Sequence, residues 1–196
     1  MCERGVFAEL SKFANRVIWL AAAAALGLAA CGGSSNRPST AKAPDYRSAL
    51  AGAPKPLANL YAHGDRLLPG GPDAFQTRLD ALRGHAVVVN KWASWCGPCR
   101  VEFPYFRSLA KRDTDVTFIG VNSNDNYGDA RKFLAEEPVP YKHFKDPNLE
   151  IAAKFNAVQS FPTTAFYDTK GELAYVHQGP YTSEDDLAED IDRYAR

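Results

Sequence analysis

Two cysteines separated by two residues form the group with the clearest chemistry in this chain. Cys96 and Cys99 stand at the start of a predicted helix, with Gly97 and Pro98 between them. Thiols at this spacing can close a disulfide with little backbone movement. The free N–H groups and the positive dipole at a helix start favour a thiolate, which lowers the pKa of Cys96 from about 8.5 toward about 7 or below. We therefore predict that Cys96 is an exposed nucleophile and that Cys99, one turn further on, is the buried resolving thiol.

The cysteine pair lies between a predicted buried strand and a predicted helix. Residues 86–92 form a nearly continuous apolar, β-branched run, which is typical of a strand buried on both faces. Residues 96–112 carry apolar side chains at helical spacing, and Pro104 should bend that helix. A second buried strand is predicted over 116–121. The cysteines are therefore expected where a central strand ends and a helix begins.

The rest of the folded part alternates short helices and strands. Four further elements are predicted, namely helices over 129–136 and 148–156 and a hairpin of strands over 164–167 and 172–176. A last helix should open at a capping box of Ser183 and Asp186 and end near residue 194. The pattern is weaker between 57 and 83, where Asp73 is expected to N-cap a helix that runs to residue 83. This succession predicts an α/β sandwich around a mixed sheet.

The first 56 residues indicate a signal peptide followed by a tether. Basic residues precede a fourteen-residue apolar stretch that is short of the roughly 20 residues a membrane-spanning helix needs. The stretch ends in Leu28-Ala29-Ala30-Cys31 and resembles the lipobox of bacterial lipoproteins, which implies acylation of Cys31 and cleavage before it. The alternative is an ordinary secretory signal with an incidental cysteine. Residues 31–56 are rich in Ser, Pro, Gly and Ala and are expected to be a flexible tether to a domain over 57–196.

The segment around the cysteines resembles the active site of the thioredoxin fold. Its sequence is Trp92-Ala93-Ser94-Trp95-Cys96-Gly97-Pro98-Cys99-Arg100. Phe161-Pro162-Thr163, before a predicted strand, matches the family's cis-proline loop. The resemblance implies a thioredoxin-like sandwich in which Pro162 packs against the cysteine pair and Phe161 offers backbone groups to a bound partner. A simple loop proline is the other interpretation of Pro162.

A subgroup is indicated by three departures from thioredoxin itself. Asn90 stands where thioredoxin has a buried Asp, and Glu102 follows Cys99 by three residues on the same helical face. Together with an inserted αβ segment from about 123 to 159, these residues resemble the TlpA/ResA branch of extracytoplasmic thiol–disulfide proteins. A carboxylate at Glu102 can take the proton of the resolving thiol during exchange. The alternative for Glu102 is a solvated helix residue.

The TlpA/ResA resemblance implies a function and its partners. It predicts an extracytoplasmic oxidoreductase that reduces disulfides of exported proteins such as apocytochrome c, and the lipobox at Cys31 adds a lipid anchor in the bacterial membrane. A membrane thiol–disulfide protein would supply the electrons. Gly97-Pro98 is the dipeptide of reducing thioredoxins, and Trp95, beside Cys96, is a candidate partner contact.

Other chemistries find less support in the sequence. The 23 basic and 23 acidic residues leave no charge excess for nucleic acid, so no such partner is expected. Arg100 rather than His follows Cys99, against a covalent c-type haem site, and the four histidines (63, 85, 143 and 177) are scattered. We therefore expect neither a metal nor a cofactor.

Three other functions stay open. The closest is an oxidant that installs disulfides in exported proteins, because sequence does not fix a reduction potential. A thioredoxin-fold copper chaperone is a second, although such proteins generally carry three residues between the cysteines and a downstream His. A binding module with a structural disulfide is the third.

Overall fold

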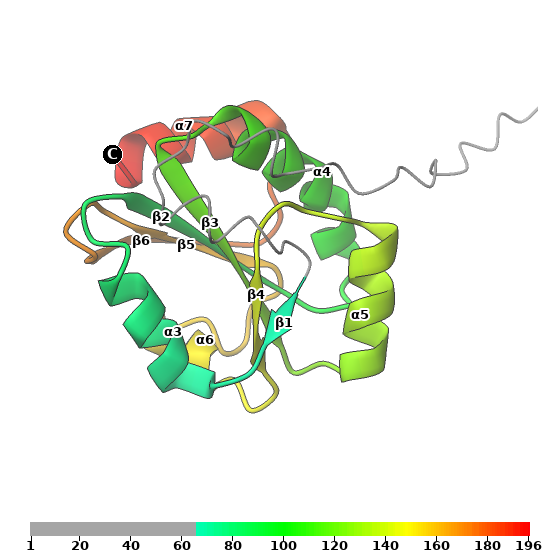
Figure 1. Cartoon of the computed structure of the whole chain (residues 1–196). Helices are drawn as coiled ribbons and strands as arrows, with labels where there is room; N and C mark the ends of the chain where they lie inside the picture. The colour runs from blue at the N-terminus through cyan, green and yellow to red at the C-terminus, as the bar shows by residue number, and fades with distance from the viewer. Residues whose placement is uncertain (1–65) are drawn as a thin grey trace, which may run out of the picture. The chain divides into compact units, whose positions relative to one another are not determined.

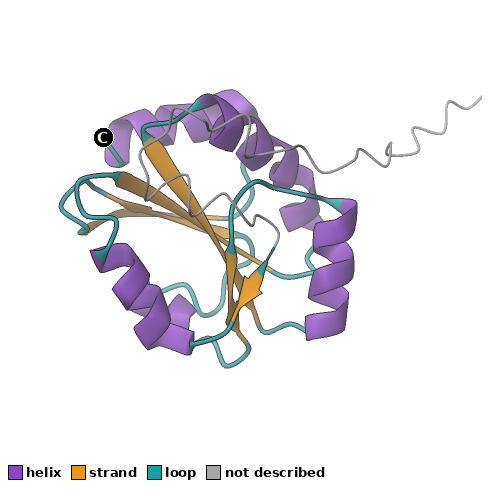
Figure 2. Cartoon of the chain, in the orientation of Figure 1, coloured by secondary structure: helices purple, strands orange, loops and turns teal. Residues whose placement is uncertain are grey.

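A six-stranded mixed sheet forms the centre of the protein in the computed structural model, which describes residues 66–196 (Figures 1 and 2). The strand order is β1-β4-β3-β2-β5-β6. The strands are β1 (Leu67–Leu68), β2 (Ala86–Trp92), β3 (Val116–Ser123), β4 (His143–Asp146), β5 (Thr163–Tyr167) and β6 (Leu173–Gln178). The neighbouring pairs β1–β4, β4–β3 and β3–β2 are parallel, and β5 is antiparallel to both β2 and β6. The predicted mixed sheet is confirmed.

The two central strands are hydrophobic because both faces of the sheet are covered. Every residue of β2 and β3 is buried, and Val88 pairs with Phe118 on one side and Phe166 of β5 on the other. Such continuous apolar runs are expected of strands covered on both faces. The strand predicted over 86–92 is confirmed, and β3 extends two residues beyond its predicted end at residue 121.

Helices cover the sheet from two sides (Figure 1). They are α3 (Gly71–Asp80), α4 (Gly97–Arg112), α5 (Tyr127–Glu136), α6 (Glu150–Lys154) and α7 (Glu184–Tyr194). α4 packs against α7, with Phe106 of α4 in an edge contact with Phe118 of β3. α3 packs against α6 and β4, where Phe75 meets Phe144. The strongly apolar faces of these helices are thus turned toward the sheet.

Several predicted boundaries were wrong in detail. Asp73 does not N-cap α3, because the helix already begins at Gly71. The N-cap is Gly70, whose φ of 117° is rarely adopted by residues with a side chain. This helix ends at Asp80 rather than residue 83, and α6 is shorter than the predicted 148–156. The last helix is capped as expected, since the Ser183 side chain accepts a hydrogen bond from Asp186 N.

The segment between β3 and β5 contains α5, β4 and α6, in agreement with the predicted αβ insertion. Its strand β4 and the short strand β1 were not predicted. β4 has the sequence His-Phe-Lys-Asp, which carries little strand propensity, and it becomes a strand by pairing with β3 and β1. This segment therefore extends the sheet beyond β3, on the side away from β2, the strand that precedes the cysteines.

The predictions for residues 1–30, Cys31 and the tether over 31–56 concern residues outside the described part. Within residues 66–196, none of the helices is both long and apolar enough to span a bilayer.

Candidate active site

Cys96 and Cys99 are joined by a disulfide at the start of α4, with their Cα atoms 5.3 Å apart. Cys96 is the N-cap of this helix, and its Sγ accepts a hydrogen bond from Cys99 N over 3.1 Å. Cys99 is fully buried, as predicted, but Cys96 is only 4% exposed and the prediction of an exposed thiol was wrong for this disulfide form. The Cys96 sulfur is bonded to the fully buried Cys99 and accepts the Cys99 N–H, so it lies against the start of the helix rather than in solvent.

Trp95 and the loop before β5 lie together beside the disulfide. The Phe161–Pro162 peptide bond is cis, as expected of the loop, and Trp95 lies with its ring centroid 4.7 Å from that of Phe161. Pairing of Lys91 with Thr163 across β2 and β5 brings this loop to the end of β2 where the cysteine turn begins. Trp95 is 56% exposed and therefore presents an aromatic surface next to Cys96.

Glu102 is fully buried on α4, one turn after Cys99. Its Oε1 accepts a hydrogen bond from Asn90 Nδ2 over 2.8 Å, and its Oε2 accepts one from Tyr181 N over 3.2 Å. Burial raises the pKa of Glu102 to about 8, against the opposing effect of these two hydrogen bonds. The alternative of a solvated helix residue is thus wrong. A carboxyl with this pKa can exchange a proton near neutral pH.

The loop after β3 holds the cysteine turn, a feature that the sequence analysis missed. Asp125 accepts hydrogen bonds from both the backbone N–H and the hydroxyl of Ser94, each over 2.6 Å, and from Asn122 Nδ2 over 2.7 Å. Trp95 Nε1 donates to Asn124 O over 2.9 Å. The signal was present, because β2 and β3 are parallel neighbours and the segments after them meet at one edge of the sheet.

Comparison with known proteins is decisive for the family. Residues 39–191 match the Redoxin family. The chain belongs to the Redoxin family. It is 38% identical over 140 residues to the thiol:disulfide interchange protein HelX of Rhodobacter capsulatus, which covers 71% of this chain and 77% of HelX. It is 29% identical over 112 residues to the thiol-disulfide oxidoreductase ResA of Oceanobacillus iheyensis, covering 56% of this chain and 58% of ResA.

A solved structure supports the same assignment for this Redoxin chain. A putative thiol:disulfide interchange protein DsbE from Chlorobium tepidum matches with a TM-score of 0.53 and 31% identity, over 59% of this chain and 83% of that one. The predicted thioredoxin-like fold and the resemblance to the TlpA/ResA branch are confirmed. So is the predicted enzyme class, a thiol–disulfide oxidoreductase.

Two histidines of this Redoxin chain, His143 and His177, contact aromatic side chains. His143 is fully buried, and its Nδ1 accepts a hydrogen bond from Nε1 of Trp92, which is also fully buried. Burial lowers the pKa of His143 to about 3, so the ring is neutral. His177 stacks on Tyr181 and lies 3.6 Å from Asp190. Among residues 66–196, we find no group of three or more His, Cys, Asp or Glu side chains arranged to hold a metal ion.

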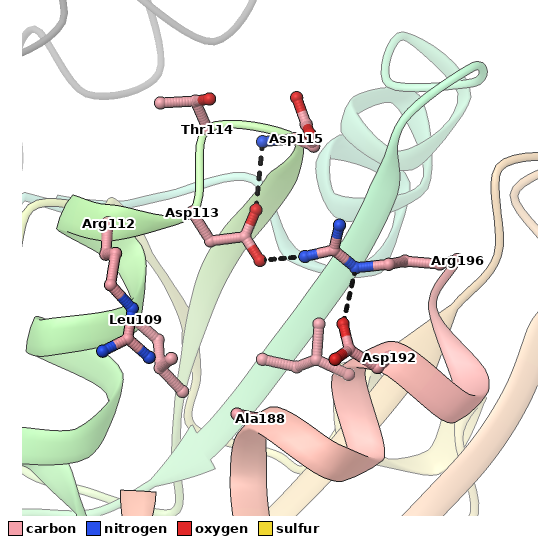
Figure 3. A pocket seen from close by; sticks show the side chains of 9 residues that line it. Leu109, Arg112, Asp113, Thr114, Asp115, Ala188, Asp192 and Arg196 are labelled. Atoms are coloured by element: carbon pink, nitrogen blue, oxygen red, sulfur yellow. Dashed lines mark hydrogen bonds and ion pairs between the residues drawn. The ribbon is translucent and has the colours of Figure 1, made fainter. Parts of the chain in front are cut away.

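A hollow of about 340 Å³ lies between α7 and the far end of α4 (Figure 3). The Arg196 guanidinium reaches across it to Asp113 and, over 2.9 Å, to Asp192 (Figure 3). With about 1.5 Å of rise per residue, the residues of α4 that line this hollow, Leu109 and Arg112, lie roughly 15 to 24 Å along the helix from the cysteines. The ion pairs therefore fasten α7 to the loop after α4 and stand apart from the redox chemistry of this Redoxin chain.

Proposed function

We propose that this protein is a membrane-tethered, extracytoplasmic thiol–disulfide oxidoreductase that reduces disulfides of exported proteins, with apocytochrome c as a substrate. The observation that carries the proposal is the Cys96–Cys99 disulfide at the start of α4, next to the exposed Trp95 ring and the Phe161–Pro162 loop. The loop precedes β5, so an extended substrate segment can lie against it while its disulfide meets Cys96.

The first chemical step takes place at Cys96. In the reduced protein its thiolate attacks one sulfur of the substrate disulfide, and the substrate S–S bond breaks as the mixed disulfide forms. The second substrate sulfur leaves as a thiolate and takes a proton from solvent. The start of α4 favours the Cys96 thiolate, because the Cys99 N–H already points at this sulfur.

The second step uses Cys99 and Glu102. The Glu102 carboxylate takes the proton of the Cys99 thiol, and the resulting thiolate attacks Cys96 Sγ. The mixed disulfide breaks, the substrate leaves as a dithiol after protonation, and the Cys96–Cys99 disulfide forms. Two electrons have then passed from the protein to the substrate. The buried position of Glu102 one turn after Cys99 supports this role, since its pKa of about 8 suits a proton acceptor near neutrality.

Reduction is favoured over oxidation by Gly97-Pro98, the dipeptide of reducing thioredoxins. The reduction potential tests this direction. Potentials of thioredoxin-fold proteins run from about −270 to −120 mV, and we expect a value near the reducing end. A potential above about −170 mV would instead assign the protein to disulfide formation.

The copper-chaperone alternative finds no support at the histidines. His143 is fully buried with Nδ1 bonded to Trp92, so it would have to leave the core to bind a metal. We expect the reduced protein to take up no copper in a tight 1:1 complex that depends on His143 or His177. Such a complex would revive the chaperone.

An insulin-reduction assay tests the enzymatic function. The wild-type protein should reduce insulin with dithiothreitol as electron source, whereas Cys96→Ser should be inactive. Equal turnover by the two proteins would instead support a binding module with a structural disulfide. Cys99→Ser should accumulate mixed disulfides with exported proteins, because the resolving thiol is missing. Mass spectrometry of these adducts identifies the substrate, and c-type apocytochromes are the expected species.

The tether is tested separately at Cys31, since this part of the proposal stems from the sequence. We expect Cys31→Ser to move the protein from the membrane to the soluble fraction while insulin reduction stays unchanged. Retention of the variant in the membrane fraction would contradict the lipid anchor.

A further inference from the structure

Lys91 is a buried lysine in an otherwise apolar part of the central strand. It stands next to last in β2 and its side chain is fully buried. The Nζ atom donates hydrogen bonds to Ala157 O over 2.5 Å and to Ser160 O over 2.7 Å. No carboxylate within residues 66–196 forms an ion pair with it. Its hydrogen-bond partners are thus backbone carbonyls of the loop that leads to β5.

The same ammonium group lies on the ring of Phe161. Lys91 Nζ is 3.4 Å from the centroid of this ring, a cation–π contact shielded from solvent. The Phe161 ring in turn contacts Trp95, which is exposed beside Cys96. A continuous series of contacts therefore joins the buried cation to the surface on which a substrate would dock.

Other hydrogen bonds hold the same loop at its far end. Thr163 Oγ1 also donates to Ser160 O, Ser160 Oγ donates to Gln178 Oε1, and Gly179 N donates to Pro162 O. These contacts fix the junction of the loop with β5 and β6. Lys91 binds an earlier residue of the loop, Ala157, and its ammonium group packs on the face of the Phe161 ring. The loop is thus held by hydrogen bonds at both ends and by the contact between Lys91 and the Phe161 ring.

We infer that Lys91 is a positioning residue that holds the 157–162 loop and the Phe161 ring in the arrangement that accepts a protein substrate. The inference rests on the proposed function and deepens it. Lys91 acts through Phe161 and two loop carbonyls, so it should govern the binding of a polypeptide that docks on the loop. It should not govern the attack of Cys96 on a small disulfide that needs no such docking.

Burial gives a reason to expect more than a packing role. Desolvation lowers the pKa of Lys91 to about 8, which shows that the charged form is held here at a cost, partly offset by the charge of Asp146. An apolar side chain in β2 would avoid that cost, as Val87 and Val89 do on the same face of the strand. A cation can bind both loop carbonyls and the face of the Phe161 ring, whereas an apolar side chain can donate no hydrogen bond to those carbonyls.

The test compares two substrates of different size in the full-length protein. Lys91→Met keeps the length of the side chain but removes the charge and both hydrogen bonds. We expect it to raise the KM for insulin about tenfold with kcat within about twofold of wild type. The rate at which oxidised glutathione oxidises the reduced protein should stay within about twofold. Lys91→Gln, which can still donate to a carbonyl, should raise the KM less.

Val89→Ala is the matched control, because Val89 is fully buried two residues earlier on the same face of β2. It should lower the urea midpoint of unfolding and leave the KM for insulin unchanged. The inference is overturned if Lys91→Met slows both substrates equally, if the KM for insulin is unaltered, or if Val89→Ala raises that KM as much. Failure of both Lys91 variants to fold while Val89→Ala folds would also overturn it, in favour of a purely structural lysine.

The proposed function fails in a different way. If the wild-type protein reduces neither insulin nor glutathione, the oxidoreductase proposal itself is wrong. If it reduces both and the Lys91 variants match it, the inference about Lys91 alone is wrong.

Discussion

The Asn90 amide lies 2.8 Å from Glu102 Oε1, and this hydrogen bond joins β2 to α4 inside the protein. Both side chains are buried, and Asn90 Oδ1 has no hydrogen-bond partner among the described residues. Asn90 therefore stabilises Glu102 with one neutral donor rather than a positive charge. This arrangement leaves most of the carboxyl protonated at neutral pH, because burial outweighs the two hydrogen bonds that it accepts, and the ionised fraction that can accept the Cys99 proton grows as pH rises.

Replacing Glu102 should slow the release of substrate from Cys96. In Glu102→Gln the group that takes the Cys99 proton is lost, and we expect the resolution of a preformed mixed disulfide to slow on the order of a hundredfold. The wild-type rate should rise with pH through about 8, where half of the carboxyl is ionised, and level off roughly one unit higher; the variant should lose this dependence. Stopped-flow measurement of resolution from pH 6 to pH 9, in steps of roughly half a unit, checks both effects.

Glu172→Gln is the control for this experiment, since Glu172 is exposed in the turn before β6. It should resolve mixed disulfides at the wild-type rate. Equal rates for wild type and Glu102→Gln would remove Glu102 from the mechanism, whatever its pKa.

Glu102 should also make stability depend on pH. Its pKa is raised from 4.5 to about 8 on folding, so between these values the unfolded chain has released a proton that the folded protein keeps. The free energy of unfolding should therefore fall as pH rises through this window, by about 1.4 kcal/mol per pH unit at most. Glu102→Gln should lack this decline. Urea unfolding of both proteins across the window measures the difference.

His143 produces the opposite slope in both proteins and cancels from the comparison. Its folded pKa of about 3 lies below the ordinary 6.5, so stability is lost as pH falls from 6.5 toward 3. Parallel curves for wild type and Glu102→Gln above pH 4.5 would show that the folded carboxyl is already ionised there.

Asp125 should be needed to hold the cysteine turn. Its two oxygens accept four hydrogen bonds, including the N–H and hydroxyl of Ser94, and an Asn side chain offers a single acceptor oxygen in their place. We expect Asp125→Asn to lower the free energy of unfolding by about 1–3 kcal/mol and to speed hydrogen exchange at the Ser94 amide. Asp73→Asn, at an exposed carboxylate of α3, should change stability by less than about 0.5 kcal/mol. Unaltered exchange at Ser94 would contradict this role.

Gly120 should tolerate no side chain. A Cβ atom at this position of β3 would lie 1.7 Å from His143 Nδ1 and so would overlap the ring that accepts the Trp92 hydrogen bond. We expect Gly120→Ala to destabilise the protein by about 3 kcal/mol or more in urea unfolding, because the added methyl group would displace a fully buried ring. At Gly97 an added Cβ meets nothing within 4 Å, so Gly97→Ala should be nearly neutral for stability. Similar stabilities for the two variants would show that His143 can move.

The sequence predicted those parts of the site that adjoin the cysteines. The apolar run of β2, the helix start at Cys96 and the helical spacing from Cys99 to Glu102 are local patterns, and each appears in the structure. The cis bond before Pro162 was predicted from resemblance rather than from local spacing. Local periodicity therefore found the elements, and family likeness supplied the loop.

The residues that were missed depend on contacts between distant segments. Asp125 meets Ser94 across 31 positions of the chain, and Lys91 meets Ala157 across 66. In the sequence Lys91 is one polar residue in a strand, and nothing local shows that its ammonium reaches a loop carbonyl. The strand at His143 was missed for a related reason, since its pairing with β3 rather than its composition makes it a strand.

The sulfur of Cys96 accepts a hydrogen bond at the beginning of α4, and in the proposed mechanism it is also the reacting atom. Each change in its bonding alters how strongly it attracts the Cys99 amide proton, most of all when it carries a full negative charge. The amide resonance of Cys99 should then take distinct positions in the dithiol, the disulfide and the substrate-bound protein. Magnetic resonance of that single backbone proton would follow turnover in real time, without a chromophore attached to either partner.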